Sequence, residues 1–265
     1  MEIEINYKLS AGKNAEDKYI LRNKLKSKVE GLDKAYNKIK TSLEKTNKDI
    51  IDISSKIVFT KRVLKNKFWF SKFRWFFTTN NFLVIAGRDA KNNELLIKKY
   101  MDKNDVYFHA DIFGAPHTIL KTQIEDVPII DKKEAACFAA SFSSAWKSKI
   151  FSVDVYSVSS NQVSKTAQTG ESLSTGSFVI SGKREYFRKS EIGIYIVFDK
   201  KYGVMAIPLI SKDFKKYDFY IKVVPGNIKK ADISKQIRDI LVSKKINASI
   251  DEIESILPPG DCNIV

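Results

Sequence analysis

The feature that most constrains the fold is a long stretch without proline in which apolar residues recur at heptad spacing. No proline occurs between Ser10 and Lys67, and Ser10 is a suitable helix N-cap. The pattern predicts a long helical arm, preceded by a short strand or extended segment over Met1–Leu9. The apolar positions are Leu25, Val29, Leu32, Tyr36, Ile39 and Leu43, and the spacing continues through Thr46, Ile50, Ile53, Ile57, Thr60 and Leu64.

The predicted arm cannot bury this seam by itself. A single helix of about fifty-five residues would be roughly 80 Å long. Its seam needs a partner helix, or the arm must fold back on itself at a turn near Thr46–Lys48. One long helix and a hairpin both fit the sequence. We expect the arm to pair with its own preceding helix or with another chain.

The chain carries an excess of basic residues. Its 46 Lys and Arg against 31 Asp and Glu give a formal net charge of +15, and residues 1–70 alone hold 17 basic and 9 acidic residues, a net of +8. Such an excess indicates an anionic partner, either a nucleic acid or an acidic membrane surface. The plain alternative is a coat of solvated lysines, including the flanks of a coiled coil.

Several classes of protein are disfavoured by what the sequence lacks. Its two cysteines, Cys137 and Cys262, have neither metal-ligand spacing nor the number needed for a disulfide framework, which fits a reducing cytosol. No run of about eighteen apolar residues could span a membrane. The first residues lack the basic start and apolar core of a signal peptide. We therefore expect a cytoplasmic protein without a membrane span.

From Phe68 onward the pattern changes to short strands and short amphipathic helices. Gly87 permits the turn before the first of these helices, Asp89 can cap it, and Pro225-Gly226 marks a strand stop. The fold class is therefore predicted as α+β: a basic helical coiled-coil arm followed by a mixed or antiparallel sheet domain with packed helices. The predicted strands are 82–86, 106–111, one ending at 121, 150–158, 194–198, 204–210 and 219–224, and the predicted helices are 90–101, 132–146, 233–241 and 250–257.

The sequence contains no recognisable catalytic set. It has no nucleophile–base pair, Walker A run, dinucleotide fingerprint, HExxH, CxxC or GxSxG motif, so we expect no enzyme activity, no cofactor and no metal. One alternative is a metal-dependent RNA hydrolase that uses His109, Asp111 and His117 as an open zinc-type site. The same three residues could instead form a hydrogen-bonded structural cluster or face RNA.

Two blocks of the sequence match one family pattern in order. On these residues the chain resembles the NFACT family, which includes NEMF in animals, RqcH in bacteria and archaeal fibronectin-binding-like members. The first block is Trp69-Phe70, Lys72–Phe76, Gly87–Ala90, Asn93-Glu94, Tyr107, His109–Asp111 and Gly114-Ala115, and the second is Gln162–Lys165, Gly170-Glu171, Leu173, Gly176–Phe178 and Gly182–Arg184. Both blocks resemble the family's NFACT-R (DUF814) domain, whereas Ile3–Ile5, Ser10, Asn14-Ala15 and Tyr19 resemble the start of its middle coiled coil. The chain departs from the pattern at Ser157, Gln168 and Ser172, where the family often has tryptophan, proline and an aromatic residue.

The resemblance implies a role in ribosome-associated quality control. NFACT proteins bind large ribosomal subunits obstructed by peptidyl-tRNA and recruit charged tRNA for template-free C-terminal tailing of the nascent chain. The implied parts are a helical coiled-coil arm over 1–67, the NFACT-R RNA-binding domain over 68–200 and C-terminal strands and helices that complete the domain over 201–265. The family's NFACT-N domain has no counterpart here, so we expect a C-terminal fragment or a split-gene product.

We therefore expect an RNA-binding module with rRNA and tRNA as partners and no membrane contact. Its affinity should fall steeply with salt, because Lys and Arg would neutralise phosphates. Arg88 could equally form a structural ion pair, the Ser- and Gly-rich segment 161–176 around Lys165 could be an ordinary loop, and a coiled-coil protein-interaction adaptor is a further alternative. The candidate RNA-binding residues are Lys72, Arg74, Arg88, His109, Lys121, Gln162, Ser164, Lys165, Lys183 and Arg184.

Overall fold

The computed structural model describes residues 4–57, 68–165 and 173–265. The chain forms two compact units, Met1–Thr60 and Lys61–Val265. The predicted seam positions Thr60 and Leu64, and the loop positions Gln168, Gly170, Glu171 and Ser172, lie outside the described residues. Among the residues that the structure does describe, no helix has both the length and the apolar character needed to cross a membrane.

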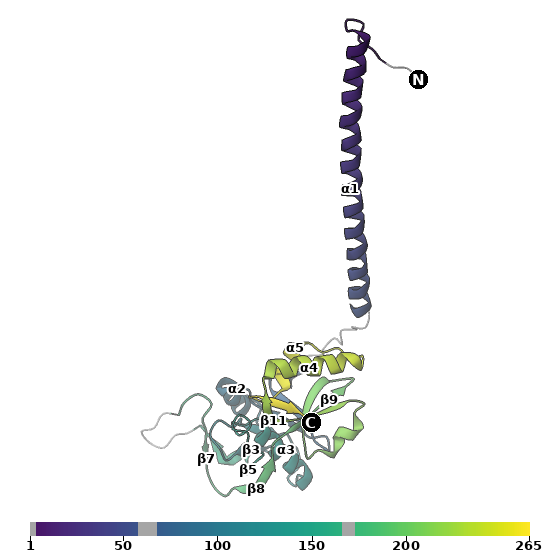
Figure 1. The fold of residues 1–265 in the computed structure, drawn as a ribbon. Helices are drawn as coiled ribbons and strands as arrows, with labels where there is room; N and C mark the ends of the chain where they lie inside the picture. Colours follow the sequence, from purple (N-terminus) through teal and green to yellow (C-terminus); the bar gives the residue numbers. More distant parts are fainter. Residues whose placement is uncertain (1–3, 58–67, 166–172) are drawn as a thin grey trace. The chain divides into compact units, whose positions relative to one another are not determined.

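The first unit is built on one helix, α1 (Ala11–Ile57), which is continuous over 47 residues (Figure 1). Of the two arrangements that fitted the sequence, the structure has the single helix, which is about 70 Å long. Ser10 caps its start, because the Ser10 hydroxyl oxygen accepts a hydrogen bond from the Lys13 N–H at 3.3 Å. No strand occurs among residues 4–10. Instead, the Asn14 side chain holds this segment by accepting from the Asn6 N–H at 2.8 Å.

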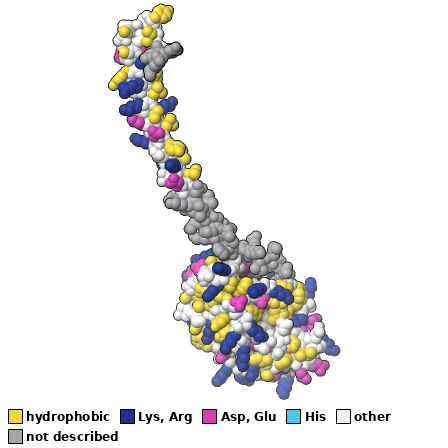
Figure 2. Space-filling model, turned by 90° about the vertical axis from the view of Figure 1, so that its right-hand side faces the viewer, with side chains coloured by type: hydrophobic (Ala, Val, Ile, Leu, Met, Phe, Trp, Pro, Cys, Tyr) yellow, Lys and Arg dark blue, Asp and Glu magenta, His cyan; other side chains and the backbone are white. Residues whose placement is uncertain are grey.

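The apolar seam of α1 is exposed along its described part. Leu25 is 53% exposed and Ile39 is 64% exposed, and Val29, Leu32 and Tyr36 lie between them with similar exposure. Figure 2 shows hydrophobic side chains along this helix. Because a solvated helix gains little stability from apolar residues that it does not bury, the seam is an unpartnered face.

The second unit is organised around a six-stranded sheet in which every strand pair is antiparallel. Its strand order is β1-β2-β4-β3-β5-β8. The predicted α+β class is confirmed, with an antiparallel central sheet. The strands are β1 (Arg74–Phe77), β2 (Leu83–Ala86), β3 (Val106–Ala110), β4 (Thr118–Leu120), β5 (Ser152–Ser159) and β8 (Glu185–Glu191).

Two smaller sheets and several short helices surround this sheet. A four-stranded sheet has the order β10-β9-β11-β12, and β6 pairs with β7 in a two-stranded sheet. The strands are β6 (Val163–Ser164), β7 (Val179–Ile180), β9 (Ile194–Asp199), β10 (Gly203–Pro208), β11 (Tyr220–Ile228) and β12 (Cys262–Ile264). The α-helices are α2 (Ala90–Leu95), α3 (Ile129–Ser141), α4 (Lys230–Ser243) and α5 (Ile250–Ile256), and the remaining short helices are η1 (Trp69–Lys72), η2 (Leu96–Tyr100), η3 (Ser160–Gln162) and η4 (Lys212–Lys216).

Strand alternation divides the buried side chains of the six-stranded sheet between two cores. On one face they pack with α3 and the four-stranded sheet, as Phe108 and Val84 do. On the other face they pack with η1 and η2, as Tyr107 and Ile85 do. Because successive residues of a strand point to opposite faces, a sheet that is covered on both sides requires near-continuous apolar strands.

The helix predicted over 132–146 is α3, which begins earlier and ends at Ser141. Ser143 explains the early end. Its hydroxyl donates to the Ala140 carbonyl at 2.7 Å and accepts from the Ala145 N–H at 3.2 Å, so its side chain replaces bonds that a helix would make. The chain continues in turns to Trp146, whose indole N–H donates to the Asp261 carbonyl at 3.0 Å.

The strand stop predicted at Pro225-Gly226 is wrong, because β11 continues through both residues to Ile228. The pairing of β11 with β9 covers only Tyr220 to Val223, so Pro225 is not required to donate to that neighbour. Its pairing with β12 shifts register between Pro225 and Ile228. A proline is tolerated in a strand at such an irregularity.

The helix predicted over 90–101 is confirmed as α2 followed by the wider π-helical turn η2. Asp89 caps it as predicted, because its carboxylate accepts a hydrogen bond from the Asn92 N–H at 2.8 Å. One turn further on, Glu94 and Lys98 form an ion pair at 2.6 Å. This pair at helical spacing holds the Glu94 carboxylate near the segment 174–178 described below.

Candidate nucleic-acid interface

A row of aromatic rings crosses three strands at one side of the six-stranded sheet. His109 on β3 pairs with Tyr156 on β5, and Tyr156 pairs with Tyr186 on β8. Their ring centroids lie 5.8 and 6.1 Å apart, as expected for directly opposed residues on one face. Exposure rises toward the edge strand β8, from 6% at Tyr156 to 36% at Tyr186.

Two exposed arginines lie on this row. The guanidinium carbon of Arg184 is 4.4 Å from the centroid of Tyr156, and that of Arg188 is 4.2 Å from the centroid of Tyr186. A guanidinium that stacks on a ring still presents N–H groups at its edge, which can donate to phosphate oxygens. The exposed Lys183 precedes them in the chain. We call this surface the arginine–tyrosine face, comprising His109, Tyr156, Lys183, Arg184, Tyr186 and Arg188.

The charges of this face are held in place by neighbouring groups. Arg188 Nη1 lies 2.5 Å from Asp154 Oδ2, and this bond raises the pKa of Arg188. A hydrogen bond to the Tyr186 side chain raises the pKa of Arg184. The Lys189 N–H donates to Asp154 Oδ1 at 2.8 Å, with the Lys189 backbone at a φ of 51°. Both arginines are therefore cationic and oriented at neutral pH.

His117 is a buried link between the sheet and the segment 174–178. Its Nδ1 lies 2.5 Å from the Tyr107 hydroxyl, and its Nε2 lies 2.7 Å from the carbonyl oxygen of Gly176. Because a carbonyl only accepts, Nε2 carries the hydrogen and the Tyr107 hydroxyl donates to Nδ1. Burial, and to a lesser degree the neighbouring His109, lowers the pKa of His117 to about 4. The ring is therefore neutral at pH 7.

These bonds do not fit the alternative in which His109, Asp111 and His117 bind a metal ion. Both ring nitrogens of His117 are already bonded, and Asp111 is exposed at the end of β3. Within residues 4–57, 68–165 and 173–265, no group of three His, Cys, Asp or Glu is placed to hold a metal ion. Burial also lowers the pKa of His109. Geometrically, both histidines belong to a hydrogen-bonded and stacked cluster.

Lys165 points inward and holds the segment 174–178. Its Nζ donates to the carbonyl oxygens of Ser174 at 3.0 Å and Ser177 at 3.1 Å, and it lies 3.5 Å from Glu94 Oε2. The same Glu94 oxygen accepts from the Gly176 N–H at 2.9 Å. A hydrogen bond from Lys98, followed by that from Gly176, lowers the pKa of Glu94 to about 2. Lys165 therefore binds backbone carbonyls of the protein itself.

Gln162 and Ser164 also have structural positions. Gln162 forms a capping box with Ser159 around η3, and its Nε2 donates to the Ser181 carbonyl at 2.7 Å and the Lys183 carbonyl at 3.0 Å. Ser164 lies on β6, opposite Val179 of β7. Gln162 therefore positions the backbone of Lys183, the first cation of the arginine–tyrosine face.

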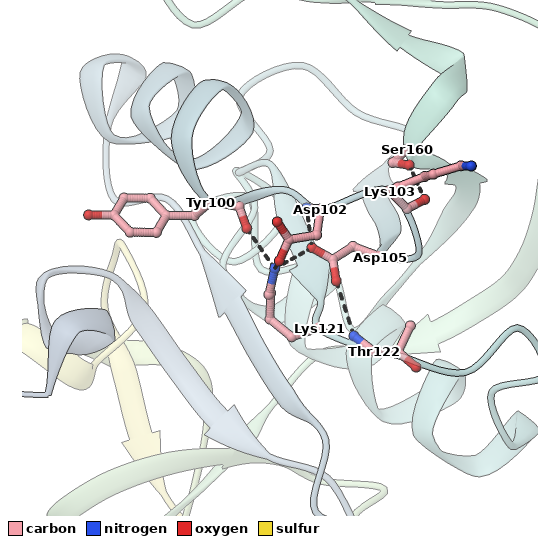
Figure 3. Close-up of polar contacts among 7 residues, drawn as sticks. All are labelled: Tyr100, Asp102, Lys103, Asp105, Lys121, Thr122 and Ser160. Carbon is pink, nitrogen blue, oxygen red and sulfur yellow. Dashed lines mark hydrogen bonds and ion pairs between the residues drawn. The ribbon is translucent and has the colours of Figure 1, made fainter.

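Lys121 binds three acceptors within the second unit (Figure 3). Its Nζ lies 2.5 Å from Asp102 Oδ2, 2.6 Å from Asp105 Oδ2 and 2.8 Å from the Tyr100 carbonyl oxygen. The Asp105 side chain is fully buried, and its other oxygen accepts from the Thr122 N–H at 3.1 Å. The ammonium group therefore compensates a buried carboxylate, a role in which its charge is already used.

Arg74 and Arg88 lie side by side on neighbouring strand ends and bond to backbone carbonyls. Arg74 Nη1 donates to Gly87 at 2.8 Å, and Arg88 Nη2 donates to Phe73 at 3.1 Å. Burial lowers the pKa of Arg74 to about 10 and lowers that of Arg88. The sequence allowed either a phosphate contact or a structural ion pair for Arg88. The described residues show no ion pair for it, and Arg88 lines a groove.

Of the ten candidate residues, the structure places His109 and Arg184 on the arginine–tyrosine face, with Lys183 next to Arg184 in the chain, and separately places Arg74 beside Arg88. Sequence reasoning missed Tyr186 and Arg188, because β8 was not predicted. It also missed Tyr156, which lies on the predicted strand 150–158 but was not singled out as a site residue. The alternation of basic and aromatic residues at 184, 186 and 188 has the period of a strand and could have revealed both the strand and its outward face. Lys72 lies elsewhere and is exposed, with its Nζ 2.5 Å from the Tyr100 hydroxyl.

Comparison with known proteins points to one family. Residues 72–182 match the NFACT protein RNA binding domain. The chain is 40% identical over 210 residues to the archaeal Rqc2 homolog aRqcH of Methanocaldococcus jannaschii, an alignment that covers 77% of this chain and 30% of that protein. It is 39% identical over 203 residues to the ribosome quality control complex subunit NEMF homolog of Drosophila melanogaster, covering 74% of this chain and 20% of that protein. The chain therefore spans less than a third of the length of these relatives.

One solved structure is also similar in part. The C-terminal part of the fibronectin/fibrinogen-binding protein from Streptococcus suis aligns with a TM-score of 0.39 at 21% identity, covering 54% of this chain and 56% of that chain.

Proposed function

The chain belongs to the NFACT family, and on this premise we propose that its second compact unit is an RNA-binding module of a ribosome quality control factor. The matched RNA-binding domain, residues 72–182, lies within this unit. A relative that is named as a ribosome quality control complex subunit supports the setting. Because the chain spans less than a third of such relatives, the proposal concerns the part that this chain contributes.

The observation that carries the proposal is the arginine–tyrosine face. Arg184 and Arg188 are exposed, cationic and stacked on aromatic rings at the edge of a sheet. Phosphate oxygens prefer planar guanidinium donors, and exposed rings beside them offer stacking surfaces to bases. Lys183 adds a third cation. We propose that the RNA backbone runs along β8 and contacts these three residues.

We propose large ribosomal subunits that carry peptidyl-tRNA as the target, with rRNA as the direct partner. In this proposal the module supports tRNA recruitment for C-terminal tailing in the cytoplasm and is not itself an enzyme. The family resemblance supports this finer proposal, and the net charge of +15 supports an anionic partner.

The arm has a separate proposed role. Its seam residues, such as Leu32 and Ile39, are 64% exposed each, which is a poor arrangement for an isolated helix. We propose that α1 pairs through this seam with the helix that precedes it in a longer protein or with another chain. A protein-interaction function of the arm is compatible with RNA binding by the second unit.

Binding of this chain to purified large ribosomal subunits in a salt series tests the RNA-binding proposal. The variant carries Lys183→Glu and Arg184→Glu. The matched control carries Lys235→Glu and Lys244→Glu, two exposed lysines on or next to α4. Figure 1 shows α4 at the opposite end of the unit from β8. Both variants change the net charge equally, so they separate a local contact from a general electrostatic effect.

We expect binding to weaken with salt and the slope of log K against log salt to fall by about two in the β8 variant, because two phosphate contacts are lost. The α4 variant should keep the slope. Equal losses in both variants would show that only net charge matters. Binding that is absent even at low salt would overturn the RNA-binding proposal.

A further inference from the structure

A second surface of the unit combines cations with an exposed aromatic ring. A groove of about 600 Å³ opens between the β2–α2 turn, the segment around Gly114 and the segment 174–177. Its lining includes the cations Arg74, Arg88 and Lys147 and one carboxylate, Asp89. Asp89 is already bonded as the cap of α2. Among the described residues that line the groove, Asp89 is the only acidic one, so their net charge is positive.

Phe113 lines this groove and is 97% exposed. Its backbone, in contrast, is held firmly. The Ser144 hydroxyl donates to the Phe113 carbonyl at 2.5 Å, and the next residue, Gly114, turns the chain with a φ of 79°. A large ring that is fixed at its base and fully solvated costs free energy in the isolated protein. Such a ring is a suitable platform for a planar apolar surface that arrives from outside.

Arg74 and Arg88 supply the charged side of the groove. Both bond to backbone carbonyls, and neither forms an ion pair within the part of the chain that the structure describes. Their Nε atoms are buried and have no partner there. Two half-buried guanidinium groups that share one described carboxylate neighbour, Asp89, favour an anion as a further ligand.

The groove and the arginine–tyrosine face are connected through Asp111. The Asp111 N–H donates to the Asp154 carbonyl at 2.8 Å, and the Asp154 carboxylate holds Arg188. Phe113 follows Asp111 by two residues. This chain path links Arg188 to the segment that presents Phe113, so an RNA strand, unlike a free mononucleotide, is a ligand that would contact both surfaces.

We propose that this groove binds one unpaired nucleotide of an RNA strand, with its base stacked on Phe113 and its phosphate facing Arg74, Arg88 and Lys147. The inference rests on the proposed RNA-binding function and adds a specificity to it. The arginine–tyrosine face contacts the backbone of any RNA, whereas the groove selects RNA with an unpaired base. Ring stacking is tolerant of base identity, so we expect little preference among the four bases.

The test measures binding of the 265-residue chain to a labelled RNA duplex, made of two annealed strands with a single-base bulge, and to the same duplex without the bulge. The variants are Phe113→Ala, Phe113→Trp, which keeps a stacking surface, and Lys147→Ala. Phe151→Ala is the matched control, because Phe151 is 64% exposed and does not line the groove. Adenosine and uridine monophosphates serve as free-nucleotide competitors. Phe113 and Phe151 are surface residues, so thermal unfolding should confirm that all variants fold.

We expect Phe113→Ala to weaken binding of the bulged duplex by about 5- to 150-fold, the range for loss of one stacked base. The salt slope should stay unchanged, because stacking releases no counterions, whereas Lys147→Ala should lower it by about one. Phe113→Trp and Phe151→Ala should bind like the unmodified chain. Phe113→Ala should bind the fully paired duplex as tightly as the unmodified chain does.

Other outcomes overturn the inference in distinguishable ways. Salt-dependent RNA binding that is unaffected by Phe113→Ala would overturn the proposed stacking site and leave the proposed RNA-binding function intact. If free monophosphates competed at the concentrations at which the RNA saturates the chain, the ligand of the groove would be a mononucleotide rather than an RNA strand. If Phe113→Ala lost binding to ribosomal subunits without any loss of binding to the bulged duplex, Phe113 would be a protein contact. Absence of all RNA binding would overturn both proposals.

Discussion

The Nε2 atom of His117 lies 2.7 Å from the carbonyl oxygen of Gly176, across 59 residues of sequence. This bond joins the end of the central sheet to a segment that also receives Lys165 and Glu94. The segment in turn lines the groove beside Arg74 and Arg88. A single neutral histidine therefore connects the buried core to the surface that we propose for RNA.

The first prediction concerns the pH dependence of this link. The pKa of His117 falls from 6.5 to about 4 on folding, so between these values the unfolded chain binds a proton that the folded chain does not. Stability is therefore full above pH 6.5 and declines as the pH falls. Between pH 7 and pH 5 the loss should be about 2 kcal/mol in the free energy of unfolding. His117→Gln should remove this part of the pH dependence.

Urea unfolding at both pH values measures this effect, and the carboxylates common to both proteins cancel in the comparison. His109→Gln is the parallel variant, because burial lowers the pKa of His109 as well. An identical pH dependence in the unmodified chain and His117→Gln would contradict a neutral, buried His117.

The second prediction concerns Gly176. Its φ is 80°, and an added Cβ would lie 2.7 Å from the Ala90 carbonyl oxygen. Gly176→Ala should combine left-handed backbone strain, about 1 to 2 kcal/mol, with a clash against backbone that cannot move aside. Gly114 has nearly the same φ of 79°, yet its nearest neighbour would be at 3.4 Å. Gly114→Ala therefore measures the strain alone. In denaturant unfolding, Gly176→Ala should have a clearly lower free energy of unfolding than Gly114→Ala.

The third prediction concerns Lys121. Lys121→Met would leave the fully buried Asp105 carboxylate without its cation, which typically costs about 3 to 5 kcal/mol. The control is Lys103→Met, because Lys103 is exposed and contributes only its backbone carbonyl, which accepts from Ser160 (Figure 3). Unfolding by urea should show a large loss for the first variant and almost none for the second. Equal stabilities would mean that Lys121 is available for phosphate.

The fourth prediction concerns metal. Because Nδ1 and Nε2 of His117 are both bonded inside the protein, zinc or manganese should not raise the melting temperature, and a chelator should not lower it. Elemental analysis of the purified chain should find far less than one equivalent of either metal. Stoichiometric zinc, together with loss of RNA cleavage in His109→Ala, would revive the hydrolase alternative.

Local patterns in the sequence correctly predicted the parts of the fold that depend on local interactions. Heptad spacing and the Ser10 cap predicted a helical arm, although they fitted both one long helix and a hairpin, and the start of α2 followed from Asp89. Predictions failed where a distant partner decides the local structure. Pro225 could stay within β11 because β9 pairs with only part of that strand. The edge strand β8, with its mixed charged and aromatic residues, lacked the apolar run on which the other strands were recognised.

The candidate site divides in the same way. The sequence by itself determined the family, the excess of positive charge and the set of cations that could meet a phosphate. It could not show which cations are already used, because their partners lie far away in the chain. Lys121 is neutralised by Asp105, 16 residues away, and Lys165 approaches Glu94, 71 residues away. Only the tertiary structure decided that Arg184 faces solvent on Tyr156, since an ion pair or a stacked ring depends on which side chains the folded sheet brings within a few ångströms.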